Sequence, residues 1–233
     1  MKRIFIPTRN GTDWQRLLAK PNLHWKVGAS AMTAAACWEA AADRLPSEIA
    51  KLLNAASRLE LADLQLLVAL PEWHVDLPGG QTKSATDVLA LCGNAQALCV
   101  IAVEAKVLED FGPTLCEKQN QTSPGQKERI KFLHELLGVM KFSDSIRYQL
   151  VHRTASALLT ARDFHASAAV MLVHAFDTPA DRTEDFNAFA KEMEAEEVSS
   201  GVYWVKRFEA PRLYLAWCSG NASFRKIELP SAT

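Results

Sequence analysis

Residues 84–107 read SATDVLALCGNAQALCVIAVEAKV, and this stretch decides the fold that the sequence predicts. Two strongly apolar runs, 88–92 and 97–103, flank the short polar connection GNAQ at 93–96. β-Prone residues on both sides of a connection that contains Gly and Asn indicate a β-hairpin. Both faces of this hairpin are apolar, so we expect it to lie in the interior of a sheet, with charge at its open end.

A turn centred between residues 95 and 96 sets the register of this hairpin. The expected cross-strand pairs are Asp87 with Glu104, Val88 with Val103, and Cys92 with Cys99. In this register the two carboxylates share one face, with their Cβ atoms about 4.5–5.5 Å apart. Lys106 lies on the same face as Glu104, because side chains two residues apart on a strand point the same way. A slip of one residue would put the carboxylates on opposite faces.

Two carboxylates that face each other at a partly buried strand end require a cation, because like charges across a ladder are destabilising. Mg²⁺ typically uses one or two protein carboxylates together with waters and phosphate oxygens. Lys106 could then hold or deprotonate a water, or stabilise charge on a phosphate. The alternative is that the strand ends reach solvent, where charged residues are ordinary.

Asp87 followed by Glu104-Ala105-Lys106 at the end of an apolar strand resembles the core of the PD-(D/E)xK nuclease superfamily, although Thr86 stands where Pro is common. The resemblance implies that Asp87 and Glu104 bind Mg²⁺ or Mn²⁺, that the Ala105 carbonyl joins them, and that Lys106 serves the attacking water. The stretches FGPTL, SPG, RYQLVHRTASALL and AAVMLVHAF resemble a group of uncharacterised bacterial proteins thought to share this nuclease-like fold. That closer resemblance implies no known activity.

The resemblance also suggests further residues near the metal. Superfamily members often supply one more acidic residue from a helix that precedes the core strands. Glu39 is the candidate, Asp43 and Glu48 fit the spacing equally well, and a solvent-facing glutamate is the alternative reading. On the helix expected at 145–164, a polar stripe contains Gln149, His152, Arg153 and Ser156. Gln149 resembles a superfamily glutamine, and the Arg153 fork suits phosphate oxygens, although any half-exposed helix carries a polar stripe.

Composition limits the partners that the sequence allows. The 233 residues include 26 Lys plus Arg and 27 Asp plus Glu, so any contact with nucleic acid requires a local patch. No apolar run approaches the about 20 residues that span a bilayer. Five cysteines without a C-x-x-C pair argue against a disulfide framework and against the usual zinc motifs. We expect a cytoplasmic protein without membrane contact. The sequence leaves open whether the protein forms a homodimer.

The remaining sequence predicts a single α/β domain over 1–233, in which a mainly helical layer, 1–60, precedes a core, 61–218. Helices are expected at 12–20, 30–44, 46–56, 124–137, 145–164 and 184–193, and further strands at 3–7, 64–70, 168–176, 202–208 and 213–218. The strand at 168–176 follows a helix, so it is expected to be parallel to its neighbour. His174 in that strand is interpreted as a hydrogen-bonded structural residue.

The sequence contains no G-x-S-x-G, H-E-x-x-H or G-x-G-x-x-G motif, and residues 78–84 lack the glycine that a phosphate loop needs before Lys83. The leading hypothesis is a mixed central sheet flanked by helices, with an N-terminal helical layer and, as the resemblance implies, a restriction-endonuclease-like core. Its expected function is Mg²⁺-dependent hydrolysis of phosphodiesters in nucleic acid. The rival hypothesis is a non-catalytic nuclease-like scaffold for binding or assembly.

Overall fold

The hairpin at 84–107 forms β2 (Ser84–Gly93) and β3 (Leu98–Lys106), in the register that the sequence predicts. Val88 pairs with Val103 and Cys92 with Cys99. Asn94 closes the turn, because its Oδ1 accepts hydrogen bonds from the backbone N–H groups of residues 96 and 97 at 2.9 and 2.8 Å. The turn chemistry and the apolar pattern therefore agree on one register.

The computed structural model describes residues 8, 11–80, 82–120 and 123–231. Within these residues, seven strands form one mixed sheet in the order β1-β2-β3-β4-β7-β6-β5. The other strands are β1 (Gln65–Val75), β4 (Ala168–Ala175), β5 (Glu196–Ser199), β6 (Val202–Glu209) and β7 (Arg212–Ser219). The helices are α1 (Gly11–Leu17), α2 (Pro21–His24), α3 (Ser30–Ala41), α4 (Ser47–Ala55), α5 (Leu115–Gln119), α6 (Pro124–Leu137), α7 (Tyr148–Asp163), α8 (Ala180–Glu192) and the 3-10 helix η1 (Ala222–Lys226).

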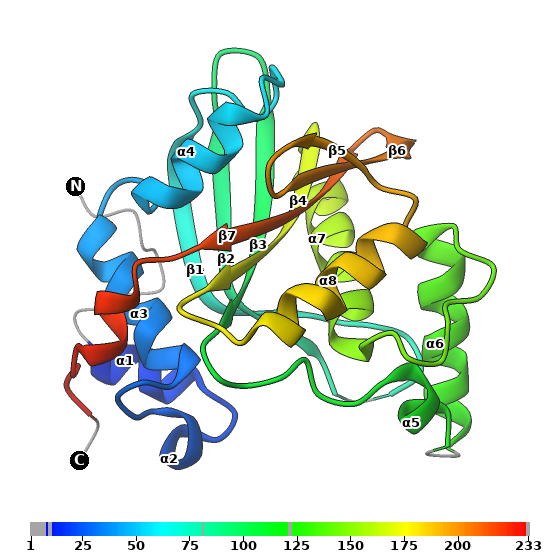
Figure 1. Cartoon of the computed structure of the whole chain (residues 1–233), viewed down its shortest axis with the longest axis horizontal. Helices are drawn as coiled ribbons and strands as arrows, with labels where there is room; N and C mark the ends of the chain where they lie inside the picture. The colour runs from blue at the N-terminus through cyan, green and yellow to red at the C-terminus, as the bar shows by residue number, and fades with distance from the viewer. Residues whose placement is uncertain (1–7, 9–10, 81, 121–122, 232–233) are drawn as a thin grey trace.

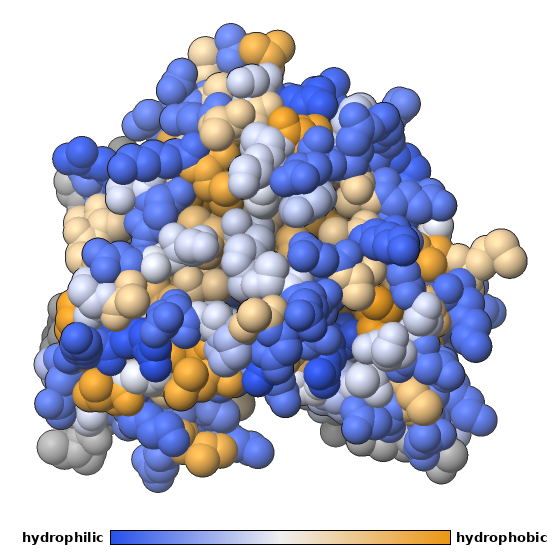
Figure 2. Space-filling view, viewed as in Figure 1, coloured by the Kyte–Doolittle hydropathy of each residue, from blue (hydrophilic) through white to orange (hydrophobic). Residues whose placement is uncertain are grey.

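Helices cover both faces of the sheet (Figure 1). One face packs on α1, α3 and α4, through a core that includes Trp38, Ile49 and the β3 residue Ile101. The other face packs on α6–α8, through a core that includes Leu133, Leu158 and the β3 residue Ala102. Alternate residues of β3 therefore enter different cores, as the period of two requires. Hydrophilic side chains surround small separate hydrophobic patches on the face seen in Figure 2.

α7 forms the crossover between β3 and β4, which pair in parallel as expected. All residues of β4 are buried, which fits a central strand covered on both faces. The α/β class with a mixed central sheet and flanking helices is therefore confirmed. No helix among the described residues has the length and apolarity to span a membrane.

Several elements differ from the sequence expectations, and the strand expected at 3–7 lies outside the described residues. The short helices α2 and η1 were not expected, the helix expected at 12–20 ends at Leu17, and α8 begins at Ala180 instead of 184. β1 does not end before Pro71 but continues to Val75. Proline is tolerated there because β1 is an edge strand, where a missing N–H need not face a neighbouring strand. The expected loop after Lys106 contains α5, which a capping box at Thr114 and Glu117 stabilises. The acidic segment after α8 supplies the short edge strand β5.

Candidate functional site

A cavity of about 600 Å³ lies at the open end of the β2–β3 hairpin, beside the first turns of α7. Its polar lining is supplied by β1, β2, β3 and α7. Eight polar side chains of this lining are called the network below: Glu72, Ser84, Asp87, Glu104, Lys106, Gln149, His152 and Arg153. The parallel β3–α7–β4 crossover brings the strand end and the helix stripe together, although about 45 residues separate them in the chain.

Glu104 lies at the centre of the network and is only 3% exposed. Its Oε1 accepts hydrogen bonds from Lys106 Nζ at 2.9 Å and from Gln149 Nε2 at 2.6 Å. Lys106 Nζ also donates to Gln149 Oε1 at 2.9 Å, so these three side chains form a closed triangle. The packing of β3 against α7 therefore fixes the positions of both Glu104 and Lys106.

Arg153 donates a hydrogen bond to the second carboxylate oxygen of Glu104. Its Nε donates to Glu104 Oε2 at 2.6 Å, and one of its terminal nitrogens donates to Ser84 Oγ at 3.0 Å. Ser84 Oγ in turn lies 2.9 Å from His152 Nδ1. The stripe residues Gln149, His152 and Arg153 thus all reach the network, whereas Ser156 donates to the His152 carbonyl within its own helix.

Asp87 is half-buried and faces the end of β3. Its Oδ2 accepts a hydrogen bond of 2.7 Å from the backbone N–H of Ala105. Ala105 itself points its side chain to the opposite face of the sheet, toward Cys37 and Phe176. The three residues Asp87, Glu104 and Lys106 therefore lie together on one face, with the Ala105 backbone at the point where the two strands separate.

Glu72 is an additional carboxylate that the sequence reasoning missed. In β1 it lies between Pro71, which pairs with Val88, and Trp73, which pairs with Thr86, so it stands opposite Asp87. Its backbone has φ of +49°, a conformation unusual for a residue other than Gly, Asn or Asp. No described residue donates a hydrogen bond to its carboxylate. A signal was available, because alternation along an uninterrupted β1 would have placed Glu72 at the charged end of the hairpin.

The electrostatics of the cavity separate the carboxylates into two kinds. Burial and the negative charge of Asp87 raise the pKa of Glu72 to about 9. Burial and the charge of Glu104 raise the pKa of Asp87 to about 7. Burial also acts to raise the pKa of Glu104, but the charges and hydrogen bonds of Lys106 and Arg153 outweigh it and hold that pKa below its usual value. Glu104 is thus ionised. Glu72 and Asp87 have too little positive charge nearby to lower their pKa values in the same way.

Sequence comparison assigns the chain to a family. A family model described as "Domain of unknown function (DUF6946)" matches residues 7–222, which is most of the chain. The chain belongs to the DUF6946 family. Comparisons with curated proteins and with solved structures find no match. The family description names no activity, so the function of this DUF6946 protein has to be argued from the cavity.

Glu72 and Asp87 supply oxygen ligands of the kind that a hard divalent cation such as Mg²⁺ prefers, and their raised pKa values reflect a shortage of positive charge that such a cation would relieve. Glu104 offers less, because three hydrogen bonds already occupy its two oxygens, which have about four acceptor positions. Among the described residues, these carboxylates do not bring three ligand atoms within 4.8 Å of one another. An ion held here would therefore keep several waters.

The other acidic residues considered for this site in the DUF6946 chain lie elsewhere. Glu39 does not line the cavity, and its Oε1 accepts a 2.7 Å hydrogen bond from the Trp14 indole. Asp43 is exposed after α3, beside Arg44. Glu48 lies on the opposite face of the sheet, next to His174. The structure therefore does not bring any of the three to Asp87, whereas Glu72 lines the cavity opposite Asp87.

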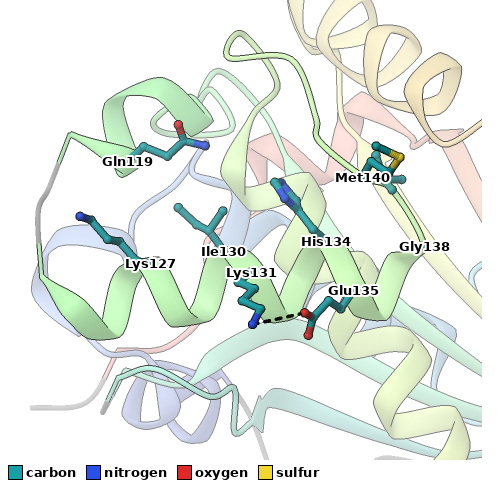
Figure 3. A pocket seen from close by; sticks show the side chains of 9 residues that line it. Gln119, Lys127, Ile130, Lys131, His134, Glu135, Gly138 and Met140 are labelled. Carbon is teal, nitrogen blue, oxygen red and sulfur yellow. Dashed lines mark ion pairs between the residues drawn. The ribbon is translucent and has the colours of Figure 1, made fainter.

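A second cavity of about 650 Å³ lies on α6 and is lined mainly by apolar surface (Figure 3). Ile130 and His134 project from the helix into it, and Met140 closes one end. The nearest charged pair, Lys131 and Glu135, is exposed and joins successive turns of the helix at 3.7 Å. Glu135 is the one carboxylate among the described residues that line this cavity, so it lacks the grouped carboxylates of the hairpin cavity.

Proposed function

We propose that this DUF6946 protein is a Mg²⁺-dependent phosphodiesterase that acts on nucleic acid. The observation that carries the proposal is the common face of Asp87, Glu104 and Lys106 at the end of the β2–β3 hairpin. Its position in a polar cavity of about 600 Å³ leaves room for a phosphodiester. Mn²⁺ could substitute for Mg²⁺, because both accept carboxylate and water ligands.

In this proposal each side chain has a defined task. Asp87, Glu104 and the Ala105 carbonyl, together with Glu72, would hold the ion, which supplies a Lewis acid for the scissile phosphate and a more acidic bound water. Lys106 would align the attacking water from its fixed position between Glu104 and Gln149. Arg153 and Gln149 would act as positioning residues for Glu104, since their donors are already committed to it.

Nucleic acid would have to approach through a local basic rim, because the whole chain has a net charge of −1. Lys83 and Lys118 line the cavity mouth, and Arg129 lines its wall. Lys118 also lies 5.5 Å from the centre of the Tyr148 ring, a placement from which it can reach a backbone phosphate. His152, whose pKa burial and Arg153 hold well below the usual value, is a neutral candidate contact.

Cleavage of plasmid, single-stranded DNA and RNA with and without Mg²⁺ or Mn²⁺ tests the proposal. Wild-type protein is expected to cut at least one substrate, and excess EDTA should abolish the activity. Lys106→Met and Asp87→Asn should each lower the rate by about 10²-fold or more, the magnitude of removing one positioned catalytic group. Lys131→Met, which changes an exposed lysine on α6, should leave the rate unchanged. Cleavage that survives Lys106→Met in full would contradict the proposal.

One observation favours the second candidate, a non-catalytic scaffold. Glu104 is paired with both Lys106 and Arg153 without any metal. A buried network of this kind can specify structure rather than chemistry. In that case no substrate is cut, and Mg²⁺ leaves the melting temperature of wild-type protein and of Asp87→Asn unchanged.

A further inference from the structure

A second group of metal-ligating side chains lies behind the hairpin cavity, on the opposite face of the sheet. Cys37 comes from α3, Glu48 from α4 and His174 from β4. His174 pairs with Ala105, the middle residue between Glu104 and Lys106. Among the described residues, these three are the group of His, Cys, Asp or Glu side chains whose ligand atoms all lie within 4.8 Å of one another.

Two of the three ligand-to-ligand distances in this group are close to the edges of a tetrahedral metal site, and the third, between Cys37 Sγ and the His174 ring, is within 4.8 Å. Cys37 Sγ lies 3.6 Å from Glu48 Oε1, and His174 Nε2 lies 3.2 Å from the same oxygen. A tetrahedral Zn²⁺ with bonds of about 2.3 Å to sulfur and about 2.1 Å to nitrogen and oxygen holds S and O about 3.6 Å apart, and N and O about 3.4 Å apart. An ion could therefore enter with only small side-chain movements.

Burial and access also fit a protein metal site. His174 is fully buried and Cys37 is 2% exposed, whereas Glu48 is half-buried. Both Cys37 and Glu48 line a cavity of about 510 Å³ that provides a path for an ion. His174 Nδ1 is buried without a hydrogen-bond partner among the described residues, so the ring can carry its proton on that nitrogen. Once the proton has moved there, Nε2 can turn a lone pair toward a metal.

We propose that Cys37, Glu48 and His174 bind a thiophilic divalent metal ion, with Zn²⁺ as the representative species. One thiolate, one carboxylate and one imidazole make three ligands, and a water completes the tetrahedron. Carboxylate oxygens alone suit Mg²⁺, but a thiolate and an imidazole select a softer ion. This site is separate from the proposed Mg²⁺ site and does not depend on the proposed phosphodiesterase activity.

The proton balance of binding follows from the groups present. The hydrogen bond from His174 lowers the pKa of Glu48 to about 2 despite burial, so Glu48 is already ionised. Burial and the Glu48 charge raise the pKa of Cys37 well above its usual value, so the thiol keeps its proton in the metal-free protein. Metal binding breaks that S–H bond and releases the proton to solvent, while the ring proton of His174 moves from Nε2 to Nδ1. No electron transfer is involved.

Titration of chelator-treated protein with Co²⁺ tests the site, because a Co²⁺–thiolate bond gives a near-ultraviolet charge-transfer band that a carboxylate site lacks. We expect that band to saturate at one Co²⁺ per chain and to be lost on addition of Zn²⁺. Zn²⁺ should also raise the melting temperature. Cys37→Ser should abolish the band, and Glu48→Gln, at a half-buried position where folding is less affected, should weaken Co²⁺ binding at least tenfold.

Two controls separate this site from other binding. Cys92→Ala removes a buried thiol far from the group and should retain the band and the stoichiometry. Asp87→Asn alters the proposed Mg²⁺ site and should also retain them, so failure of the phosphodiesterase proposal leaves this test intact. Absence of a thiolate band in wild-type protein, or a band that survives in folded Cys37→Ser, would overturn the proposal.

Discussion

Glu104 carries a negative charge at a position that is almost inaccessible to water. Its side chain is 4% exposed and that of Arg153 is 11% exposed, so the ion pair between them is buried. Removing Arg153 leaves Glu104 Oε2 without its donor while Lys106 still pairs with Oε1, whereas neutralising Glu104 as well removes the charge that needs that donor. The contribution of Arg153 to stability therefore depends on whether Glu104 is ionised.

Arg153→Met is expected to lower the free energy of unfolding by about 3–5 kcal/mol, as found for broken buried pairs. The double variant Arg153→Met with Glu104→Gln should recover a large part of this loss, because the neutral amide needs no cation. Denaturant unfolding of the wild type, both single variants and the double variant measures the coupling. Arg162→Met, an exposed position on the same helix, should change stability by no more than about 0.5 kcal/mol. Additive effects of the two substitutions would contradict this electrostatic account.

At this scale, strand register was enough to predict which of the candidate residues meet. The period of two on β2 and β3 put Asp87, Glu104 and Lys106 on one face, and the helical period put Gln149 and Arg153 on one stripe. The sequence could not show that Arg153 and Gln149 would bind Glu104, because that contact depends on how α7 crosses the sheet. Glu72 lies outside the predicted site because the sequence predicts that the strand ends before Pro71, whereas β1 continues to Val75.

At the scale of elements, hydrogen bonds connect α6 to the loop that leads into β2. Arg129 is buried and donates hydrogen bonds to the carbonyls of Leu77, Pro78 and Gly80, at 3.0, 3.0 and 3.2 Å. Gly79 has φ of +76° and packs so closely on the helix that an added Cβ would lie 2.1 Å from the Gly125 carbonyl oxygen. One arginine thus holds a loop that borders the proposed active site.

Arg129→Met is expected to release this loop without unfolding the sheet. Backbone carbonyls that lose their donors become free to move, so amide hydrogen exchange over 76–83 should rise at least tenfold, while exchange in β4 stays unchanged. Hydrogen exchange followed by mass spectrometry measures both segments in one experiment. Lys127→Met, at an exposed position two residues earlier on α6, provides the matched control. Equal exchange in the two variants would show that Arg129 does not hold the loop.

Most elements could be predicted from periodicity, and those that were missed have physical reasons. The long strands and amphipathic helices bury a continuous face, so their pattern is strong in the sequence. α5 has five residues and β5 has four, which is too short for a period to appear. Local capping at Thr114 and edge pairing with β6 stabilise them instead.

Across the whole molecule, the sheet separates two cores and also two candidate metal sites. Cys37, Glu48 and His174 are far apart in sequence and match no short motif, which is why the cysteine and histidine spacing indicated no zinc site. Only the packing of α3 and α4 on β4 brings them together. The same strand β3 separates them from Glu104 and Lys106, because Ala105 faces one way and its neighbours face the other.

A single domain requires both cores to unfold together, and two adjacent residues of β4 test this. Met171 is buried in the core with α6–α8, and Leu172 in the core with α1, α3 and α4. Met171→Ala and Leu172→Ala should each lower the free energy of unfolding by about 2–5 kcal/mol. Each kcal/mol lost should lower the melting temperature by about 2–4 °C. Leu59→Ala, at an exposed position, should have almost no effect on either quantity. Trp14, Trp25 and Trp38 lie in the core with α1, α3 and α4, so fluorescence weighted to that layer and far-ultraviolet circular dichroism should report one coincident transition in every variant. A sheet that both cores share transmits the loss of packing on either face to the whole molecule, so the two transitions should move together. If Leu172→Ala instead moved only the fluorescence transition, the helices before residue 60 would unfold as a separate layer.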